Sequence, residues 1–545
     1  MSSSMSSVAT DRADALEDAV VLDAVVVGAG FAGMYMLHKL RELGLTARVY
    51  EAGTGVGGTW YWNRYPGARV DVESLEYSYQ FSEDLQQKWV WSERYATQPE
   101  LLRYAEHVAE RFDLKRDIRL NTRVQSAHFD ESTGRWQITT DKGAASARFF
   151  ILASGCLSST NVPDFKGLRD FKGNWYHTGG WPHDGVDFTG KRVAVVGTGS
   201  SAIQSIPVIA QQAKHLFVFQ RTATYSVPAH NGPVDPVALA RVKANYREFR
   251  ERNAKTGYGF ILDANEGSAL SVSAEERNAV YESRWARGGL GFYGSFGDFL
   301  SDKAANDTAA DFIRQKIRSA VRDPAVAELL CPKTVVGCKR LCVDTGYYET
   351  YNRPNVTLVD VSKTPIDRIT ATGLRVGDRD YDVDAIVFAT GFDAMTGSVM
   401  KIDIRGKRGL RLAEKWAAGP RNYLGLGVAG FPNMFLIAGP GSPSVLTNML
   451  PSIEQHVRWI GDCIATMQSR QAQRIEPMEG AEETWVSHVN ELAAASLFPS
   501  CNSWYLGANV PGKPRVFMPY SGGFATYVER CNEVASHGYE GFSLS

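Results

Sequence analysis

The chain has 545 residues, more than one hydrophobic core usually supports, so two or three domains are expected. It is 44% hydrophobic, 11% aromatic and 22% charged, an ordinary composition for a soluble globular protein. A formal net charge of −1 leaves no basic excess for a nucleic-acid backbone or an anionic membrane, which excludes both as partners and favours small molecules.

The first 20 residues are rich in serine and acidic residues and contain no apolar stretch of signal-peptide type. They predict a disordered tail on a cytoplasmic protein. No uninterrupted apolar run in the sequence is long enough to cross a bilayer.

The seven cysteines are odd in number and scattered, without a Cys-x-x-Cys pair. This pattern argues against a disulfide framework and against a zinc site, so no metal is expected. Cys338 and Cys342 are the only close pair, and we interpret both as ordinary buried thiols.

A nucleotide-binding pattern begins at residues 22–27, an apolar, β-branched run that predicts a buried parallel strand. The Gly-x-Gly-x-x-Gly turn of residues 28–33 follows, then a helix over 34–43 and a second strand over 45–50 that ends at Glu51. In this βαβ pattern the glycines let backbone approach a pyrophosphate, the helix N-terminus attracts it, and the acid binds a ribose. The sequence therefore predicts a dinucleotide site at this point.

Residues 53–67 combine glycines with aromatic side chains, which suits the flat isoalloxazine ring of a flavin, although a structural aromatic loop would look the same. Asp71 and Glu73 follow, and carboxylates in such a position are usually solvated unless a cation from elsewhere reaches them. Further on, we expect a helix over 101–112, a strand pair over 124–140 and a buried strand over 148–153.

Residues 171–182, FKGNWYHTGGWP, contain glycines and a proline that favour neither a helix nor a strand. Because the segment lies between two nucleotide-binding signatures, we interpret it as an ordered connector between two domains rather than an aromatic surface loop.

A second nucleotide unit follows, with a strand over 191–196, a Gly-x-Gly-x-x-Ala turn over 197–202 and a helix over 203–212. The fingerprint tolerates an alanine at the third position, where helix packs on strand. The next strand, 215–219, leads into Arg221 where the first unit has Glu51. A guanidinium would bind a 2′-phosphate that a carboxylate would repel, so this site is predicted to prefer NADP over NAD.

The rest of the chain returns to strands after a charged, helical insertion at residues 237–333. Strands are expected over 357–361, over 382–389 and before the Gly-Pro-Gly turn near residue 440, and a helix over 451–467. The predicted fold class is α/β, with two Rossmann-like dinucleotide-binding domains, for FAD and NADP, and a helical insertion.

The sequence resembles one family closely, the class I, single-component, FAD- and NADPH-dependent Baeyer–Villiger monooxygenases, from residue 21 to about 545. The connector has the form F-x-G-x-x-x-H-x-x-x-W-P, which is this family's fingerprint, and its defining positions are Phe171, Gly173, His177, Trp181 and Pro182. The segments YPGARVDVES, GPGSPSVLTNML and SWYLGAN look most like the phenylacetone and steroid monooxygenase branch.

The resemblance implies a catalytic Arg340 over the flavin with Asp71 as its carboxylate partner, and Lys339 with Arg221 at the NADP 2′-phosphate. It implies that Trp504 contacts the nicotinamide cofactor and that His177 couples domain movement. The full set of implied cofactor-binding residues is Gly28, Gly30, Phe31, Gly33, Glu51, Gly58, Thr59, Trp60, Asp71, Tyr77, Gly197, Thr198, Gly199, Ser200, Ser201, Gln204, Arg221, Thr222, Lys339, Arg340 and Trp504.

The implied reaction uses NADPH and O2 to insert one oxygen beside a ketone carbonyl, through a flavin peroxide and a tetrahedral adduct, giving an ester or lactone. The implied partners are a small-molecule ketone and O2, and the implied assembly is a monomer or weak homo-oligomer. The implied domains are a first FAD segment (21–157), an NADP domain (158–393, with the insertion at about 235–333) and a second FAD segment (394–545).

Three other interpretations are open to test. A flavin N- or S-oxygenating monooxygenase shares both nucleotide sites, but Trp181 and Pro182 speak against it. A disulfide reductase would need a redox dithiol near the flavin, and residues 53–66 contain no cysteine. A non-catalytic NADPH sensor would have the same domains but would not consume NADPH when supplied with a ketone.

Overall fold

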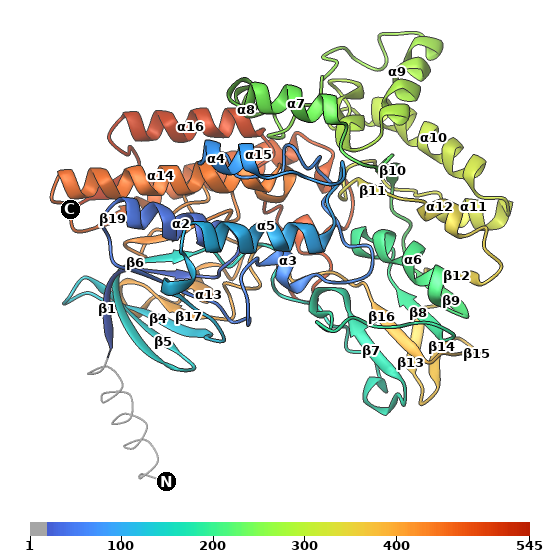
Figure 1. Ribbon diagram of the computed structural model, residues 1–545, viewed down its shortest axis with the longest axis horizontal. Helices are drawn as coiled ribbons and strands as arrows, with labels where there is room; N and C mark the ends of the chain where they lie inside the picture. Colours follow the sequence, from blue (N-terminus) through green and yellow to red (C-terminus); the bar gives the residue numbers. More distant parts are fainter. Residues whose placement is uncertain (1–18) are drawn as a thin grey trace.

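The computed structural model describes residues 19–545, in which two separate β-sheets carry the two nucleotide-binding patterns (Figure 1). Most of the tail predicted for residues 1–20, namely residues 1–18, lies outside the described residues. The first strand begins at Val20. No helix within residues 19–545 is both long and apolar enough to cross a membrane.

The first sheet has the order β17-β4-β5-β6-β1-β2-β3, and β18 also pairs with β6. Strands β1, β2 and β6 are parallel, as the βαβ pattern requires, whereas β4, β5 and β6 form the antiparallel portion that contains the predicted strand pair. The bounds are β1 (Val20–Val27), β2 (Ala47–Tyr50), β3 (Ile118–Arg119), β4 (Val124–Asp130), β5 (Arg135–Thr140), β6 (Gly143–Leu152), β17 (Asp403–Arg405) and β18 (Met434–Leu436).

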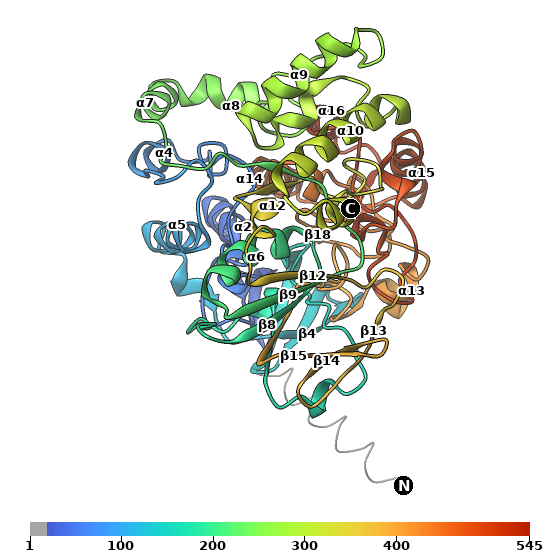
Figure 2. The ribbon, with the colours of Figure 1, turned by 90° about the vertical axis from the view of Figure 1, so that its right-hand side faces the viewer.

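The second sheet is parallel throughout, with the order β12-β9-β8-β16-β7. Its strands are β7 (Asn174–His177), β8 (Arg192–Val196), β9 (His215–Gln220), β12 (Val356–Asp360) and β16 (Ala385–Phe388). A small antiparallel sheet of β13 (Ile366–Ile369), β14 (Gly373–Val376) and β15 (Arg379–Asp382) lies beside it (Figure 2).

The prediction that the connector contains no strand is wrong for four residues, because Asn174 to His177 form β7 at the edge of the second sheet. Pairing with β16 supplies the hydrogen bonds that the local composition does not suggest. Its edge position also leaves the Trp175 ring 42% exposed.

Helices cover the sheets and join the early and late regions of the chain. Helix α2 (Phe31–Glu42) follows the first glycine turn, and α14 (Met449–Ser469) packs along it (Figure 1). Helix α6 (Ser200–Gln212) follows the second glycine turn. Other elements are α3 (Thr59–Trp62), α4 (Glu83–Lys88), α5 (Gln98–Arg111), α12 (Tyr347–Thr350), α13 (Leu412–Lys415), α15 (Glu479–Ala494), α16 (Phe524–Ser536), β10 (Ser226–Pro228), β11 (Cys342–Asp344), β19 (Ile475–Pro477) and β20 (Phe542–Leu544).

The predicted insertion is helical. Its helices are α7 (Pro236–Ala244), α8 (Tyr246–Ala254), α9 (Ala274–Arg287), α10 (Lys303–Ala320) and α11 (Pro324–Leu330). Helices α7 to α9 lie at one end of the molecule (Figure 2), whereas the carbonyl oxygen of Leu329 in α11 accepts a hydrogen bond from Gln220 at the end of β9 in the second sheet. Several aromatic rings, including Tyr281, Phe292 and Phe312, stack to form the core of the insertion.

Candidate active site

Two glycine-rich turns from the first domain meet face to face. A Cβ atom on Gly58, which has a φ of +54°, would lie 2.8 Å from the Cα atom of Gly30, and one on Gly28 would lie 2.7 Å from the carbonyl oxygen of Ala153. Side chains are therefore excluded on both turns, which leaves bare backbone facing a ligand. This is the cradle that a pyrophosphate needs.

Glu51 lies at the end of β2 beside these turns and is only 6% exposed. Its carboxylate accepts hydrogen bonds from the backbone N–H groups of Ala29 (2.8 Å) and Gly53 (2.7 Å). Each carboxylate oxygen can accept a further hydrogen bond, so the side chain is held in place and can still bind ribose hydroxyls.

A cavity of about 430 Å³ extends from these turns to the second domain. Thirteen of the residues that the sequence analysis selected line it: Gly28, Gly30, Phe31, Glu51, Gly58, Thr59, Trp60, Asp71, Tyr77, Ser200, Gln204, Arg340 and Trp504. Gly33 does not line the cavity, because it packs helix α2 against the backbone of Gly28. The cavity therefore brings together residues from both nucleotide-binding units.

Arg340 and Asp71, which are 269 residues apart, form a two-point ion pair at the cavity wall. Nε and Nη2 of Arg340 each lie 3.0 Å from a different oxygen of the Asp71 carboxylate. Nη1 donates a third hydrogen bond, of 2.6 Å, to the carbonyl oxygen of Val445. Paired bonds of this kind fix the plane of the guanidinium as well as its position.

The pairing leaves Arg340 permanently charged and still able to bind a ligand. Burial by itself lowers the pKa of Arg340, but the Asp71 carboxylate together with the Tyr505 and Tyr293 side chains more than offsets it, and the pKa lies above its ordinary value. A guanidinium has five N–H donors, and the described region of the chain uses three of them. Two donors on a fixed cation remain for a ligand in the cavity.

The second glycine turn, Gly197 to Ala202, opens helix α6. A Cβ atom on Gly197 would lie 2.6 Å from the carbonyl oxygen of Ala389, whereas one on Gly199 would meet nothing within 4 Å. The backbone at Gly199 therefore faces open space at a helix N-terminus, where an anion is stabilised. Thr198 ties this turn to the next strand end through a hydrogen bond of 2.8 Å to the carbonyl oxygen of Thr222.

Helix α6 is also joined to the aromatic loop of the first domain. The Gln204 side chain accepts a hydrogen bond of 2.8 Å from the Tyr65 hydroxyl and donates one of 3.1 Å to the carbonyl oxygen of Arg69. The two nucleotide units are therefore in direct contact at the cavity.

Arg221 follows strand β9 of the second nucleotide-binding unit, and its charge acts on Lys339 from another part of the chain. Burial lowers the pKa of Lys339 below its ordinary value of 10.5, and the Arg221 charge lowers it further. Within residues 19–545, neither cation has a carboxylate within ion-pair distance. Two like charges held close in this way are typical of a site for a polyanion such as a phosphate.

Comparison with known proteins places this geometry in a family. Residues 25–279 match the family described as pyridine nucleotide-disulphide oxidoreductase. The chain is 46% identical over 525 residues to a Baeyer-Villiger monooxygenase of Pseudooceanicola batsensis, and 95% of each chain is covered. A solved steroid monooxygenase bound to NADP is 57% identical, with a TM-score of 0.92 and coverage of 96% of this chain and 99% of that one.

The chain belongs to the Baeyer–Villiger monooxygenases. The family resemblance seen in the sequence is thereby confirmed, as is the α/β fold with FAD and NADP domains. The protein is an NADPH-dependent flavin monooxygenase that inserts one oxygen beside a ketone carbonyl to give an ester or lactone.

The cofactors are FAD and NADP, and the residues present fit both. A solved complex of OTEMO with FAD and NADP is 40% identical to this chain, with a TM-score of 0.93 and coverage of 97% and 100%. The side-chain-free turns at Gly28, Gly30 and Gly58 suit one nucleotide, and the open backbone at Gly199 with two adjacent cations suits the other. One relative is named for a different activity: phenazine N-monooxygenase PhzNO1 of Lysobacter antibioticus is 44% identical over 534 residues, with 97% of this chain and 98% of that one covered.

The family's fingerprint histidine does not line the cavity of this monooxygenase. His177 is 4% exposed, and its Nδ1 accepts a hydrogen bond of 3.0 Å from the backbone N–H of Gly179. Its Nε2 lies 3.3 Å from the hydroxyl of Thr390, which in turn donates to the carbonyl oxygen of Asn161. The ring thus joins two chain crossings between the sheets, and burial lowers its pKa, so it is neutral.

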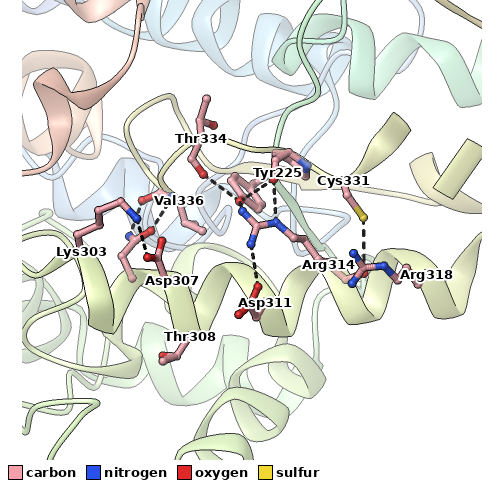
Figure 3. Close-up of polar contacts among 12 residues, drawn as sticks. Tyr225, Lys303, Asp307, Thr308, Asp311, Arg314, Arg318, Cys331, Thr334 and Val336 are labelled. Carbon is pink, nitrogen blue, oxygen red and sulfur yellow. Dashed lines mark hydrogen bonds and ion pairs between the residues drawn. The ribbon is translucent and has the colours of Figure 1, made fainter. Parts of the chain in front are cut away.

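The segment that carries Lys339 and Arg340 is held by helix α10. Arg314 donates to the carbonyl oxygen of Pro332 (2.8 Å) and to the Tyr225 hydroxyl (3.0 Å), and that hydroxyl lies 2.9 Å from the carbonyl oxygen of Thr334 (Figure 3). Asn306, also on α10, makes two hydrogen bonds of 2.9 Å with the backbone of Val336. The insertion, in which the sequence showed no chemistry, thus positions the two basic residues.

The expectation that Cys338 is an ordinary thiol is wrong, because Cys338 and Cys501 form a disulfide. The two residues are 163 positions apart, so neither spacing nor motif could indicate the pair. Cys342, in contrast, is a buried free thiol, as expected.

Several residues to which the sequence assigned no individual role line the cavity, although the loop of residues 444–449 was expected to shape the pocket. They include Tyr65, Arg69, Arg123, Ser398, Lys401, Val445, Thr447 and Met449. Tyr65 lies within the loop of glycines and aromatics and Arg69 lies just after it, so both could have been suspected from their position. Val445 acts through its backbone carbonyl, which leaves no signal in the side-chain pattern.

Proposed function

We propose that Arg340, held by Asp71, is the cation that makes oxygen insertion possible in this monooxygenase. The observation that carries this role is the two-point ion pair at the cavity wall, after which two guanidinium donors are still free of contacts with the described residues. When bound, reduced FAD supplies the oxygen atom that is inserted, and that atom comes from O2. The chain's own contribution is to hold a permanent positive charge where negative charge develops on oxygen.

Arg340 acts by electrostatic stabilisation. Its guanidinium does not lose its proton, so it stabilises an anionic oxidant and the oxyanion of the ketone adduct without accepting or releasing a proton itself. A preorganised donor of this type lowers the activation barrier by about 3 kcal/mol or more where an oxyanion forms. Asp71 lowers the cost of burying the charge and prevents rotation of the guanidinium.

We propose further that Arg221 and Lys339 bind the 2′-phosphate of NADP, which explains why two cations lie together. Gly197, Thr198, Gly199, Ser200, Ser201, Gln204 and Thr222 would hold the remainder of that nucleotide. Gly28, Gly30, Phe31, Glu51, Gly58, Thr59, Trp60 and Tyr77 would hold FAD, and Gly33 would support that site indirectly by letting helix α2 pack against the Gly28 backbone. Trp504, at the cavity between the two, would cover the nicotinamide and keep water out.

The proposed substrate is a small ketone, accepted with O2 by a monomer or weak homo-oligomer in the cytoplasm. Strands β17 and β18 return from the end of the chain to the first sheet, which supports the proposed division into a first FAD segment (21–157), an NADP domain (158–393) and a second FAD segment (394–545).

A second activity, N-oxygenation of an aromatic heterocycle, is favoured by one observation, the 44% identity to a phenazine N-monooxygenase. It needs no fixed cation for an oxyanion, so the Arg340 and Asp71 pair favours the ketone reaction. The test supplies phenyl, cyclic and steroidal ketones together with phenazine, NADPH and isotopically labelled O2. We expect labelled ester or lactone as the main product, whereas N-oxide alone would contradict the proposal.

A further inference from the structure

The disulfide of Cys338 and Cys501 joins two segments that both reach the active site. Cys338 is fully buried and directly precedes Lys339 and Arg340, whereas Cys501 is half-buried and lies three residues before Trp504. Their Cα atoms are 6.0 Å apart, within the range that a disulfide spans without backbone movement.

One side of this link is a fixed support. The segment around Cys338 is held by Asn306 of α10 through the backbone of Val336. On the other side of the cysteine, the Tyr293 hydroxyl accepts a hydrogen bond of 3.0 Å from the backbone N–H of Leu341. Together with the ion pair of Arg340, these bonds hold the segment without any help from the disulfide.

The Trp504 side is held by contacts at and after Trp504. The carbonyl oxygen of Tyr505 accepts a hydrogen bond of 3.0 Å from the backbone N–H of Met518, and the Tyr505 ring is buried in a cluster with Phe517 and Met518. The backbone hydrogen bonds of Ser503 and Trp504 run to their neighbours Leu506, Gly507 and Ala508 in the same loop. The loop is fastened to the NADP side further on, where Asn509 donates to the carbonyl oxygen of Phe392 (2.7 Å). The residues just before Trp504 therefore depend on the disulfide for a direct bond to the Arg340 segment.

We propose that Cys338 and Cys501 are positioning residues whose disulfide fastens the residues just before Trp504 to the Arg340 segment and so holds this wall of the NADP site in place. The bond itself is independent of the proposed function, but its effect on NADP rests on the proposed place of Trp504 there. Reduction would release the loop while leaving Arg340 and Asp71 paired.

The bond forms when two thiols lose two electrons and two protons to a peroxide, which is reduced to water. A dithiol such as dithiothreitol reverses the reaction, since its own oxidation supplies the two electrons and two protons. In a reducing compartment such a disulfide is typically redox-sensing rather than structural. The fraction of protein with the loop attached would therefore rise with the peroxide concentration and fall with the thiol concentration.

The first test counts thiols by alkylation during unfolding of the peroxide-treated protein. With seven cysteines and one disulfide, five thiols are expected. Removing one member of the pair, by Cys501→Ser or Cys338→Ala, frees the other and raises the count to six. The matched control Cys463→Ala removes a buried free thiol in α14 and lowers it to four. Seven thiols in the peroxide-treated parent protein would overturn the proposal.

The second test measures hydrogen exchange of residues 496–508 in the oxidised and the dithiothreitol-reduced holoenzyme. We expect faster exchange after reduction, the same fast exchange in Cys501→Ser with or without dithiothreitol, and no change in Cys463→Ala before reduction. Equal exchange in the oxidised and reduced parent protein would show that the bond does not position the loop, and would also overturn the proposal.

The same samples report on the cofactor. A loop that the disulfide already holds in place loses less conformational entropy when NADP⁺ binds. Reduction is therefore expected to weaken NADP⁺ binding by about three- to tenfold. The rate of FAD reduction at saturating NADPH should stay unchanged. Equal NADP⁺ affinity in both redox states would contradict the assigned effect on the NADP site. Failure of every form to bind NADP⁺ would count against the proposed function. Hydrogen exchange would still show whether the disulfide positions the loop.

Discussion

At the scale of single residues, the catalytic role of Arg340 depends on how Asp71 restrains it. The side chain of Arg340 is 17% exposed and that of Asp71 is 30% exposed, so the pair is only partly screened by water. Replacing Asp71 with asparagine exchanges one of the two acceptor oxygens for an NH2 group, which cannot accept from Arg340, so the two-point contact is lost while the guanidinium keeps its charge.

Asp71→Asn is therefore expected to lower the rate of ester formation at least about tenfold and to release more hydrogen peroxide per NADPH consumed. Product chromatography and peroxide assays give both quantities. The control is Glu73→Gln, which breaks the neighbouring ion pair with Arg94 away from the cavity. Unchanged ester yield in Asp71→Asn would show that Arg340 needs no carboxylate to stay in place.

Lys339 provides a prediction about pH. Its pKa is lowered by burial and by Arg221, so it loses its charge at a lower pH than a free lysine. The preference for NADP⁺ over NAD⁺ should therefore fall as pH rises toward the ordinary lysine pKa. In Lys339→Arg, which keeps its charge, the preference should persist. Parallel pH dependence in both proteins, measured from the two dissociation constants, would refute a role for the Lys339 charge.

Some of the site residues can be predicted from the sequence pattern alone, and others cannot. Glu51 and Arg221 follow from local spacing, because each ends a strand after a glycine turn. Arg340 and Asp71 do not, because the pair forms only when segments 269 residues apart fold together. Without the family resemblance, Lys339 and Arg340 would have been taken for a solvated surface dipeptide.

At the scale of elements, the contact of two glycine turns is the feature that builds the FAD cradle. Gly58→Ala would place a Cβ atom 2.8 Å from the Cα of Gly30, on a residue with a φ of +54°. We expect the purified variant to contain much less FAD, measured by its absorbance. Gly480→Ala, whose Cβ would meet nothing within 4 Å in α15, should keep its FAD. Full FAD content in Gly58→Ala would be the contrary result.

Elements with strong periodicity were predictable, and those formed by distant pairing were not. Strand β1 and helix α2 follow from apolar patterning and lie where the sequence places them. Strand β7 was missed because its residues Asn174 to His177 become a strand only by pairing with β16, about 200 residues further on.

At the scale of the whole molecule, Glu76 joins three regions of the chain. Its carboxylate accepts a hydrogen bond of 2.9 Å from the backbone N–H of Ile261, and its carbonyl oxygen accepts bonds from Arg250 and Asn448. Burial raises its pKa from 4.5 to about 8. The folded protein thus holds the proton that the unfolded chain releases above pH 4.5.

The sign of the pH effect follows from that difference. The stability that protonated Glu76 supports is complete below pH 4.5 and is lost as pH rises through about 8. Glu76→Gln should match the parent protein near pH 4.5. At pH 8 to 9 its free energy of unfolding should exceed that of the parent, by about 1.4 kcal/mol for each unit by which the Glu76 pKa is raised, so it should melt at a higher temperature there. Melting curves that differ equally at both ends of this range would contradict the assignment.

The overall architecture was predictable from two repeated nucleotide patterns, and the α/β fold is as expected. Two long-range contacts were not predictable: the disulfide of Cys338 and Cys501, and the hydrogen bonds from Asn306 of α10 to Val336. Each joins segments that share no motif. These long-range contacts hold the segments that carry Arg340 and Trp504, both of which line the cavity.

The most direct measurement compares Arg340→Ala with the parent protein in two steps, absorbance loss of the bound flavin on adding NADPH, and ester formed from a ketone in the presence of O2. Because the guanidinium is assigned to oxygen insertion and not to hydride transfer, the variant should bleach its flavin but form no detectable ester. Ester formation at near the parent rate would contradict the central role assigned to Arg340.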